Sequence, residues 1–75
     1  MSIADKMFSE LGYIKQEGLR YIDYMYDNNK ITFYKDYKWF SCSKCEEIDY
    51  VNMKELQAIN EKCKELGWLW QNKNY

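Results

Sequence analysis

The three cysteines are the most reactive side chains in this sequence. Cys42 and Cys45 form a Cys-x-x-Cys pair, and Cys63 follows further along the chain. Such a pair is typical of zinc sites and of thiol–disulfide couples. A closed zinc site needs four ligands, and because the chain has no histidine, Glu46 or Glu47 would have to be the fourth. Acidic neighbours also oppose thiolate formation, so we predict free thiols with no metal and no cofactor, and keep a small zinc-stabilised structural module as an alternative.

Neighbouring carboxylates are the second arrangement with catalytic potential. Glu46, Glu47 and Asp49 lie close together in the sequence, and two carboxylates can act as acid and base where apolar surroundings separate their pKa values. These three lie among polar residues, which indicates a solvated acidic turn. The absence of histidine excludes histidine-dependent triads and general bases, and the chain contains no glycine-rich phosphate loop. We therefore expect that the protein is not an enzyme.

The segment from Thr32 to Phe40 is the strongest candidate for binding, because it interleaves aromatic and lysine residues. In strands, Phe33 and Tyr34 point to opposite faces, and so do Trp39 and Phe40. If helices cover one face, some of the rings remain on the open face. The register of the strands then determines whether Lys35 or Lys38 lies beside them. The predicted binding residues are Tyr34, Lys35, Tyr37, Lys38 and Trp39. Rings beside cations anchor protein interfaces or stack on the bases of a nucleotide or single-stranded nucleic acid, although strands favour aromatic residues whatever their function.

Residues 3–11 are predicted to form a helix. Ser2 can cap its N-terminus, Asp5 places a carboxylate in the first turn, and Gly12 suits a left-handed C-terminal cap. At helical spacing, the apolar face consists of Ile3, Met7, Phe8 and Leu11. This face is expected to cover part of the domain's core.

The middle of the chain is predicted to be an antiparallel meander of three or four strands, because aromatic and branched residues alternate with turn-forming residues. The expected strands are residues 13–16, 19–26, 31–35 and 38–42. The expected turns are Glu17-Gly18, Asp27-Asn28-Asn29-Lys30 and Asp36-Tyr37. A stretch at residues 48–51 is a candidate for one more strand.

A second helix is predicted over residues 53–66. Asn52 and Glu55 match a capping box, and Val51 and Leu56 flank it in the manner of a hydrophobic staple. The apolar stripe consists of Met53, Leu56, Ile59, Cys63 and Leu66. The polar face, interpreted as solvated surface, consists of Lys54, Gln57, Glu61, Lys62 and Lys64.

The tail after Gly67 carries two more large rings, Trp68 and Trp70. Tryptophans directly after a helix more often pack against the core of their own domain than contact a partner protein. If these rings are exposed instead, they form an adhesive patch that favours a homodimer.

Size and composition place these elements in one domain. The chain has 75 residues and is 47% apolar, with three Trp, three Phe and eight Tyr. Because so small a domain buries little surface, aromatic side chains must supply much of its core. Two amphipathic helices can cover one face of an antiparallel sheet. The prediction is a single α+β domain over residues 1–75, with the order helix, β-meander, helix and both helices on the same face.

Charge and hydropathy narrow the range of functions. Eleven basic and 12 acidic residues give a net charge of −1, which does not make the strongly basic surface that phosphate binding requires. No apolar run approaches the ~20 residues of a membrane span, and no secretory signal is visible at the N-terminus. We expect a cytoplasmic protein without membrane contact.

Two stretches resemble small uncharacterised proteins that phages and prophages of low-GC Gram-positive bacteria encode. They are Phe8–Tyr13, with the sequence Phe-Ser-Glu-Leu-Gly-Tyr, and Met53–Trp68, which covers the second helix. The Tyr/Lys-rich middle is similar as well. The resemblance transfers no catalytic residue, but it implies an accessory protein in the cytoplasm of an infected cell that binds a host protein, for example as an inhibitor of CRISPR defence. The alternative function is a nucleotide or single-stranded nucleic-acid binding module.

Overall fold

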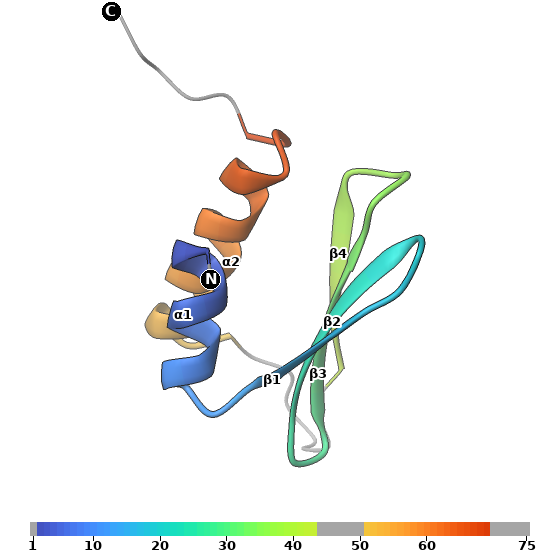
Figure 1. The fold of residues 1–75 in the computed structure, drawn as a ribbon. Coiled ribbons are helices and arrows are strands. Elements are labelled where there is room, and N and C mark those ends of the chain that lie inside the picture. Colours follow the sequence, from blue (N-terminus) through green and yellow to red (C-terminus); the bar gives the residue numbers. More distant parts are fainter. Residues whose placement is uncertain (1, 44–50, 70–75) are drawn as a thin grey trace, which may run out of the picture.

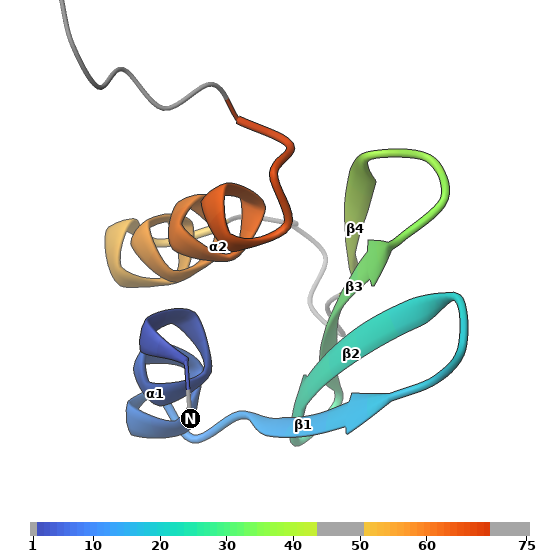
Figure 2. The same ribbon diagram turned by 45° about the horizontal axis from the view of Figure 1, so that its top comes forward.

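The fold consists of two helices and one four-stranded sheet. A computed structural model describes residues 2–43 and 51–69. The elements are α1 (Ile3–Glu10), β1 (Ile14–Glu17), β2 (Tyr21–Tyr26), β3 (Asn29–Tyr34), β4 (Trp39–Ser43) and α2 (Met53–Glu65). The strands form an antiparallel sheet in the order β1-β2-β3-β4. Both helices lie on one side of this sheet (Figures 1 and 2), so the predicted α+β fold is confirmed. Residues 48–50 of the candidate extra strand lie outside the described residues.

The end of α1 shows how local signals set the direction of the chain. The Ser2 side chain accepts a hydrogen bond from the Asp5 N–H, as the cap prediction requires. At the other end Gly12 has a φ of +95°, a conformation that glycine adopts without strain. The next residue, Tyr13, donates its N–H to the Phe8 carbonyl at 3.0 Å, and its ring packs edge-on against the Phe8 ring. This hydrogen bond is the mark of a Schellman motif, which turns the chain from α1 into β1.

The helix α2 begins and ends in the same way. Asn52 and Glu55 form the predicted capping box, with both reciprocal hydrogen bonds present. Gly67 has a φ of +77°, and the Trp68 N–H donates to the Cys63 carbonyl at 2.9 Å. This second Schellman motif turns the Trp68 ring back toward the core, where its centroid lies 6.1 Å from that of Phe33. Trp70, the other ring of the tail, lies outside the described residues.

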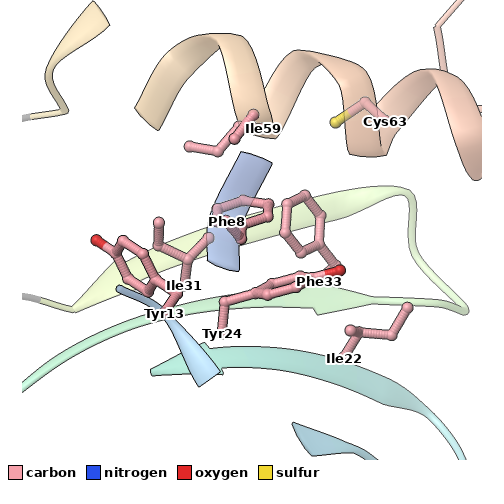
Figure 3. Close-up of a cluster of buried hydrophobic side chains, with 9 residues drawn as sticks. Phe8, Tyr13, Ile22, Tyr24, Ile31, Phe33, Ile59 and Cys63 are labelled. Carbon is pink, nitrogen blue, oxygen red and sulfur yellow. The ribbon is translucent and has the colours of Figure 1, made fainter. Parts of the chain in front are cut away.

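The core lies between the sheet and the two helices. In the β2–β3 register Ile22 is opposite Phe33 and Tyr24 is opposite Ile31, so all four side chains point to the helices. The Phe8 ring of α1 stacks on Tyr24, with 4.0 Å between the centroids. The buried cluster, shown in Figure 3, consists of Phe8, Tyr13, Ile22, Tyr24, Ile31, Phe33, Ala58, Ile59 and Cys63. As the composition predicts, aromatic side chains supply much of this core, since three of its four largest fully buried side chains are aromatic.

The buried face of α2 differs from the predicted stripe. Met53 and Leu56 are exposed, whereas Glu55 and Lys62 are buried together with Ala58, Ile59 and Cys63. The prediction that Lys62 belongs to a solvated face is therefore wrong. The physical reason is that α2 contacts α1 as well as the sheet, and the side of α2 that faces α1 carries polar residues. The buried side of α1 also differs from the predicted one, because Ile3 is exposed and Ala4 is buried. The Ala4 N–H donates to the Glu65 carboxylate of α2 at 2.9 Å.

One buried carboxylate, that of Glu55, and one partly buried carboxylate, that of Asp5, connect the elements. In α2, one Glu55 oxygen accepts the Asn52 N–H at 3.0 Å, and the other accepts a short hydrogen bond from the Tyr13 hydroxyl. Burial, together with this bond to Glu55, raises the pKa of Tyr13 above its ordinary value. In α1, Asp5 accepts a hydrogen bond from the Tyr24 hydroxyl and forms the ion pairs that hold α1 to both the sheet and α2.

The Asp5 carboxylate has two cations near it. The Lys15 ammonium of β1 lies 2.9 Å from one Asp5 oxygen, and the Lys62 ammonium of α2 lies 3.4 Å from the other. Burial by itself would raise the pKa of the Asp5 carboxyl, but the hydrogen bonds from Tyr24 and Lys15 and the charge of Lys62 outweigh it. They lower this pKa from 3.8 to about 2.

A loss of stability in acid follows from the lowered pKa of Asp5. Because the folded pKa is below the unfolded one, the unfolded chain binds more protons in between, and unfolding takes up a proton at Asp5. The stabilisation is complete above about pH 4 and is lost as the pH falls toward 2. Urea melts at pH 5, 4, 3 and 2 should show a steeper fall of unfolding free energy for the wild type than for Asp5→Asn. Parallel profiles would contradict the assignment.

Candidate binding surface

Three of the five predicted binding residues come together at the β3–β4 hairpin. Tyr34 and Trp39 are cross-strand partners whose ring centroids lie 6.4 Å apart, nearly perpendicular. Tyr37, from the loop between the strands, stacks on Trp39 with 5.0 Å between centroids and 28° between planes. We call these three residues the aromatic cluster. Such ring contacts add about 0.5–1.5 kcal/mol each beyond the area they bury, so the cluster is preorganised for contact.

The hairpin loop holds the cluster in place through the backbone. The Tyr37 N–H donates to the Tyr34 carbonyl at 3.3 Å, and Lys38 takes a left-handed φ of 57°, which returns the chain to β4. The loop is also tied to the neighbouring β1–β2 hairpin. There the Arg20 carbonyl accepts the Lys35 N–H at 2.9 Å, and the Arg20 guanidinium lies 3.5 Å from the Asp36 carboxylate.

The cluster lies on the face of the sheet that the helices leave uncovered. The exposed fractions are 36% for Tyr34, 63% for Tyr37 and 58% for Trp39. Together with Phe40 and Ser41 they line a hollow of about 520 Å³. Exposure of large aromatic rings to water is unfavourable in free energy. A preformed apolar hollow of this size is typical of binding sites. The expectation that rings remain on the open face therefore holds for these three.

The two predicted lysines do not join the cluster. The Lys35 side chain points to the helix side of the sheet, where its ammonium lies 2.7 Å from the Glu17 carboxylate and 3.1 Å from the Gly18 carbonyl. The cause is strand alternation, since Lys35 follows Tyr34 directly. Lys38 is exposed in the loop and does not line the hollow.

The open face continues from the cluster toward β2. A second hollow of about 270 Å³ is lined by Tyr21, Asp23, Lys30, Thr32 and Tyr34. Tyr34 lines both hollows, and its partner across the strands is Tyr21. Tyr21, Phe40 and Ser41 also line the two hollows and were not among the predicted binding residues. The pairing of Tyr21 with Tyr34 could have been found by counting back from a two-residue turn at Asp27-Asn28, which is the turn that the structure has.

The cysteines form no site in the described chain. Cys63 is buried, and burial raises the pKa of its thiol. Cys42 is partly buried at the edge of the core. Within residues 2–43 and 51–69, no three metal-ligating side chains gather. Cys45, Glu46, Glu47 and Asp49, on which the zinc and acid–base alternatives depend, lie outside these residues.

Comparison of the chain with protein-family models, with curated protein sequences and with solved structures finds no match. In the described part of the chain, neither α1 nor α2 is long and apolar enough to span a bilayer.

Proposed function

We propose that this chain is a non-enzymatic binding protein that docks a partner protein on the aromatic cluster. The observation that carries the proposal is the exposure of Tyr34, Tyr37 and Trp39, three rings already packed on one another on an uncovered sheet face. Tyrosine and tryptophan are the residues most enriched among energetic anchors of protein interfaces. The side chains around the hollow are rings and a hydroxyl, which bind a surface without supplying an acid–base pair.

The charges around the cluster favour a protein over a nucleic acid. Two of the basic residues beside the hairpin, Arg20 and Lys35, are paired with Asp36 and Glu17. Among the described residues, this leaves Lys38 and Lys30 as the exposed lysines next to β4 without an ion pair. Binding of a phosphate backbone depends on cations that are free to replace counterions, and paired cations contribute less. Stacking of a nucleotide base on Trp39 is the alternative that this surface also fits.

The proposed partner is a host protein. This step rests on the resemblance to proteins of phages and prophages, which implies an accessory protein that acts by binding in an infected cell. An inhibitor of bacterial defence, CRISPR included, is the concrete form of the proposal. Of the two rings proposed for a homodimer, Trp68 is partly buried against Phe33, which makes it a poor anchor for self-association.

Trp39→Ala is expected to abolish capture of the partner. We propose affinity capture from lysate of a low-GC Gram-positive bacterium, with each retained protein measured by mass spectrometry. Loss of a central anchor costs about 2–4 kcal/mol, or roughly 30-fold to 1,000-fold in affinity. The matched control is Ile3→Ala, which removes an equally exposed apolar side chain from α1, on the helix side of the sheet.

A partner retained by the wild type and by Ile3→Ala, and lost with Trp39→Ala, supports the proposal. Equal recovery from both variants contradicts it. The nucleic-acid alternative is tested with a fluorescent oligothymidylate in increasing salt. Binding that weakens steeply with salt and disappears with Trp39→Ala would replace the protein partner by a nucleic acid.

A further inference from the structure

The two outermost strands of the sheet differ in how they are protected. In the described chain β1 and β4 each pair with a single neighbour. On β1, Lys15 and Glu17 point to the helix side and are held in ion pairs, and such inward-pointing charges discourage pairing with another strand. β4, with the sequence Trp-Phe-Ser-Cys-Ser, contains no charged residue, proline or glycine. An uncharged outer strand with exposed rings is a template for a further strand.

The register shows which backbone groups of β4 point outward. The Lys35 N–H donates to the Arg20 carbonyl, so residues 20 and 35 form a hydrogen-bonded pair between β2 and β3. Because hydrogen bonding alternates along antiparallel strands, the even-numbered residues of β3 direct their backbone groups to β4. Their partners are Trp39, Ser41 and Ser43. Phe40, between two of these, therefore directs its N–H and C=O away from β3, along the outer edge of the sheet.

The larger hollow is lined in part by β4. Its lining includes Trp39, Phe40 and Ser41, three consecutive residues of β4. Trp39 and Ser41 point to the open face, whereas Phe40 points to the helix side, opposite Phe33. The hollow on the open face therefore extends over the stretch of β4 that includes Phe40, whose backbone N–H and C=O point outward.

The geometry points to an extended segment of the partner protein that adds to β4 as a fifth strand. This inference rests on the proposed function and names the form in which the partner binds. In strand addition, backbone hydrogen bonds supply affinity and alternate side chains supply specificity. Here the segment pairs with Phe40, and its side chains on the open face contact Trp39 and Tyr37. The five residues of β4 match a segment of about 17 Å.

The lysines at the two ends of β4 favour a segment of a partner protein over a second copy of this chain. Lys38 precedes β4, and Lys30 lies beside Ser43 at its other end. Within residues 2–43 and 51–69 neither lysine forms an ion pair. A segment that is apolar in its middle and acidic at its ends complements these cations. An antiparallel second copy would bring its own Lys38 and Lys30 to the same ends, and like charges across strands are unfavourable.

The test uses a chemically synthesised chain in which one backbone nitrogen is methylated. N-methyl-Phe40 keeps every side chain and blocks the outward N–H of β4. N-methyl-Lys15 is the matched control, because it blocks the outward N–H of β1 at the opposite edge. The probes are linear peptides of about 12 residues, selected on the wild-type protein from a random display library. We expect the selected peptides to be apolar with acidic ends. Their affinity should be at least tenfold lower for the N-methyl-Phe40 chain than for the wild type, and should change by less than twofold for the N-methyl-Lys15 chain.

Hydrogen exchange on the wild-type complex gives a second reading that needs no variant. The Phe40 amide should exchange at least tenfold more slowly when the selected peptide is bound. If Trp39→Ala weakens the peptides while N-methylation and Phe40 exchange show no effect, strand addition is refuted and the proposed function stands. If Trp39→Ala lowers the affinity of no selected peptide, both strand addition and the proposed function are refuted. A dimer of the wild type that N-methyl-Phe40 dissociates would overturn the partner segment in favour of a second copy.

Discussion

Phe33→Ala is expected to leave the chain without a cooperative unfolding transition at 25 °C. Phe33 is fully buried, and its ring lies within 6.2 Å, between centroids, of rings from four other segments of the fold. These rings are Phe8 of α1, Tyr24 of β2, Phe40 of β4 and Trp68 after α2. Removing a buried phenylalanine ring costs about 3–5 kcal/mol. The entire stability of so small a domain is about 5 kcal/mol.

Urea titration followed by circular dichroism measures this effect. Phe33→Leu keeps most of the volume and should retain a transition, with a loss of about 1 kcal/mol. Tyr37→Ala removes an exposed ring and serves as the surface control, with a change of at most about 1 kcal/mol. A midpoint for Phe33→Ala close to that of the wild type would show that the core does not depend on this ring.

Asp5→Ala is expected to destabilise the domain by about 3 kcal/mol. The substitution leaves the Lys62 ammonium buried with one remaining carboxylate, Glu65, at 3.6 Å, and it removes the acceptor of the Tyr24 hydroxyl. Removing one partner of a buried pair costs about 3–5 kcal/mol, because the other charge stays buried. The remaining contact with Glu65 places the expected loss at the lower end of that range.

A double-mutant cycle separates this buried charge from other causes. Lys62→Met replaces the ammonium by an apolar group of similar length, so Asp5→Ala combined with Lys62→Met should be more stable than Asp5→Ala alone. The free energies of unfolding come from urea melts at pH 7. Additive losses in the double variant would show that the two residues do not interact in the folded state.

Much of the secondary structure was predictable because its signals are local. The caps at Ser2 and Asn52 and the left-handed glycines at positions 12 and 67 act on backbone groups within four residues. The strands were predictable from runs of aromatic and branched residues between turns. Their ends differ by one or two residues, for example at β3, which begins at Asn29 rather than at Ile31.

The candidate surface was only partly predictable, since it depends on the register of strands. The sequence indicates that Tyr34, Tyr37 and Trp39 are close along the chain, but not which face each side chain occupies. A shift of one residue would have exchanged Tyr34 for Lys35 on the open face. The register follows from the two-residue turn at Asp27-Asn28, and it is held by buried pairs such as Ile22 and Phe33 under α1 and α2.

The order and types of the helices and strands, and the caps of the helices, follow from the sequence, because capping, turn geometry and side-chain alternation act over a few residues. Tertiary structure alone decided that Lys62 is buried beside Asp5, that Lys35 lies across the sheet from the aromatic rings, and that the uncharged strand β4 is at an edge. These features depend on how each helix is rotated against its neighbours and on how the strands align. Both are set by packing between residues that are remote along the chain.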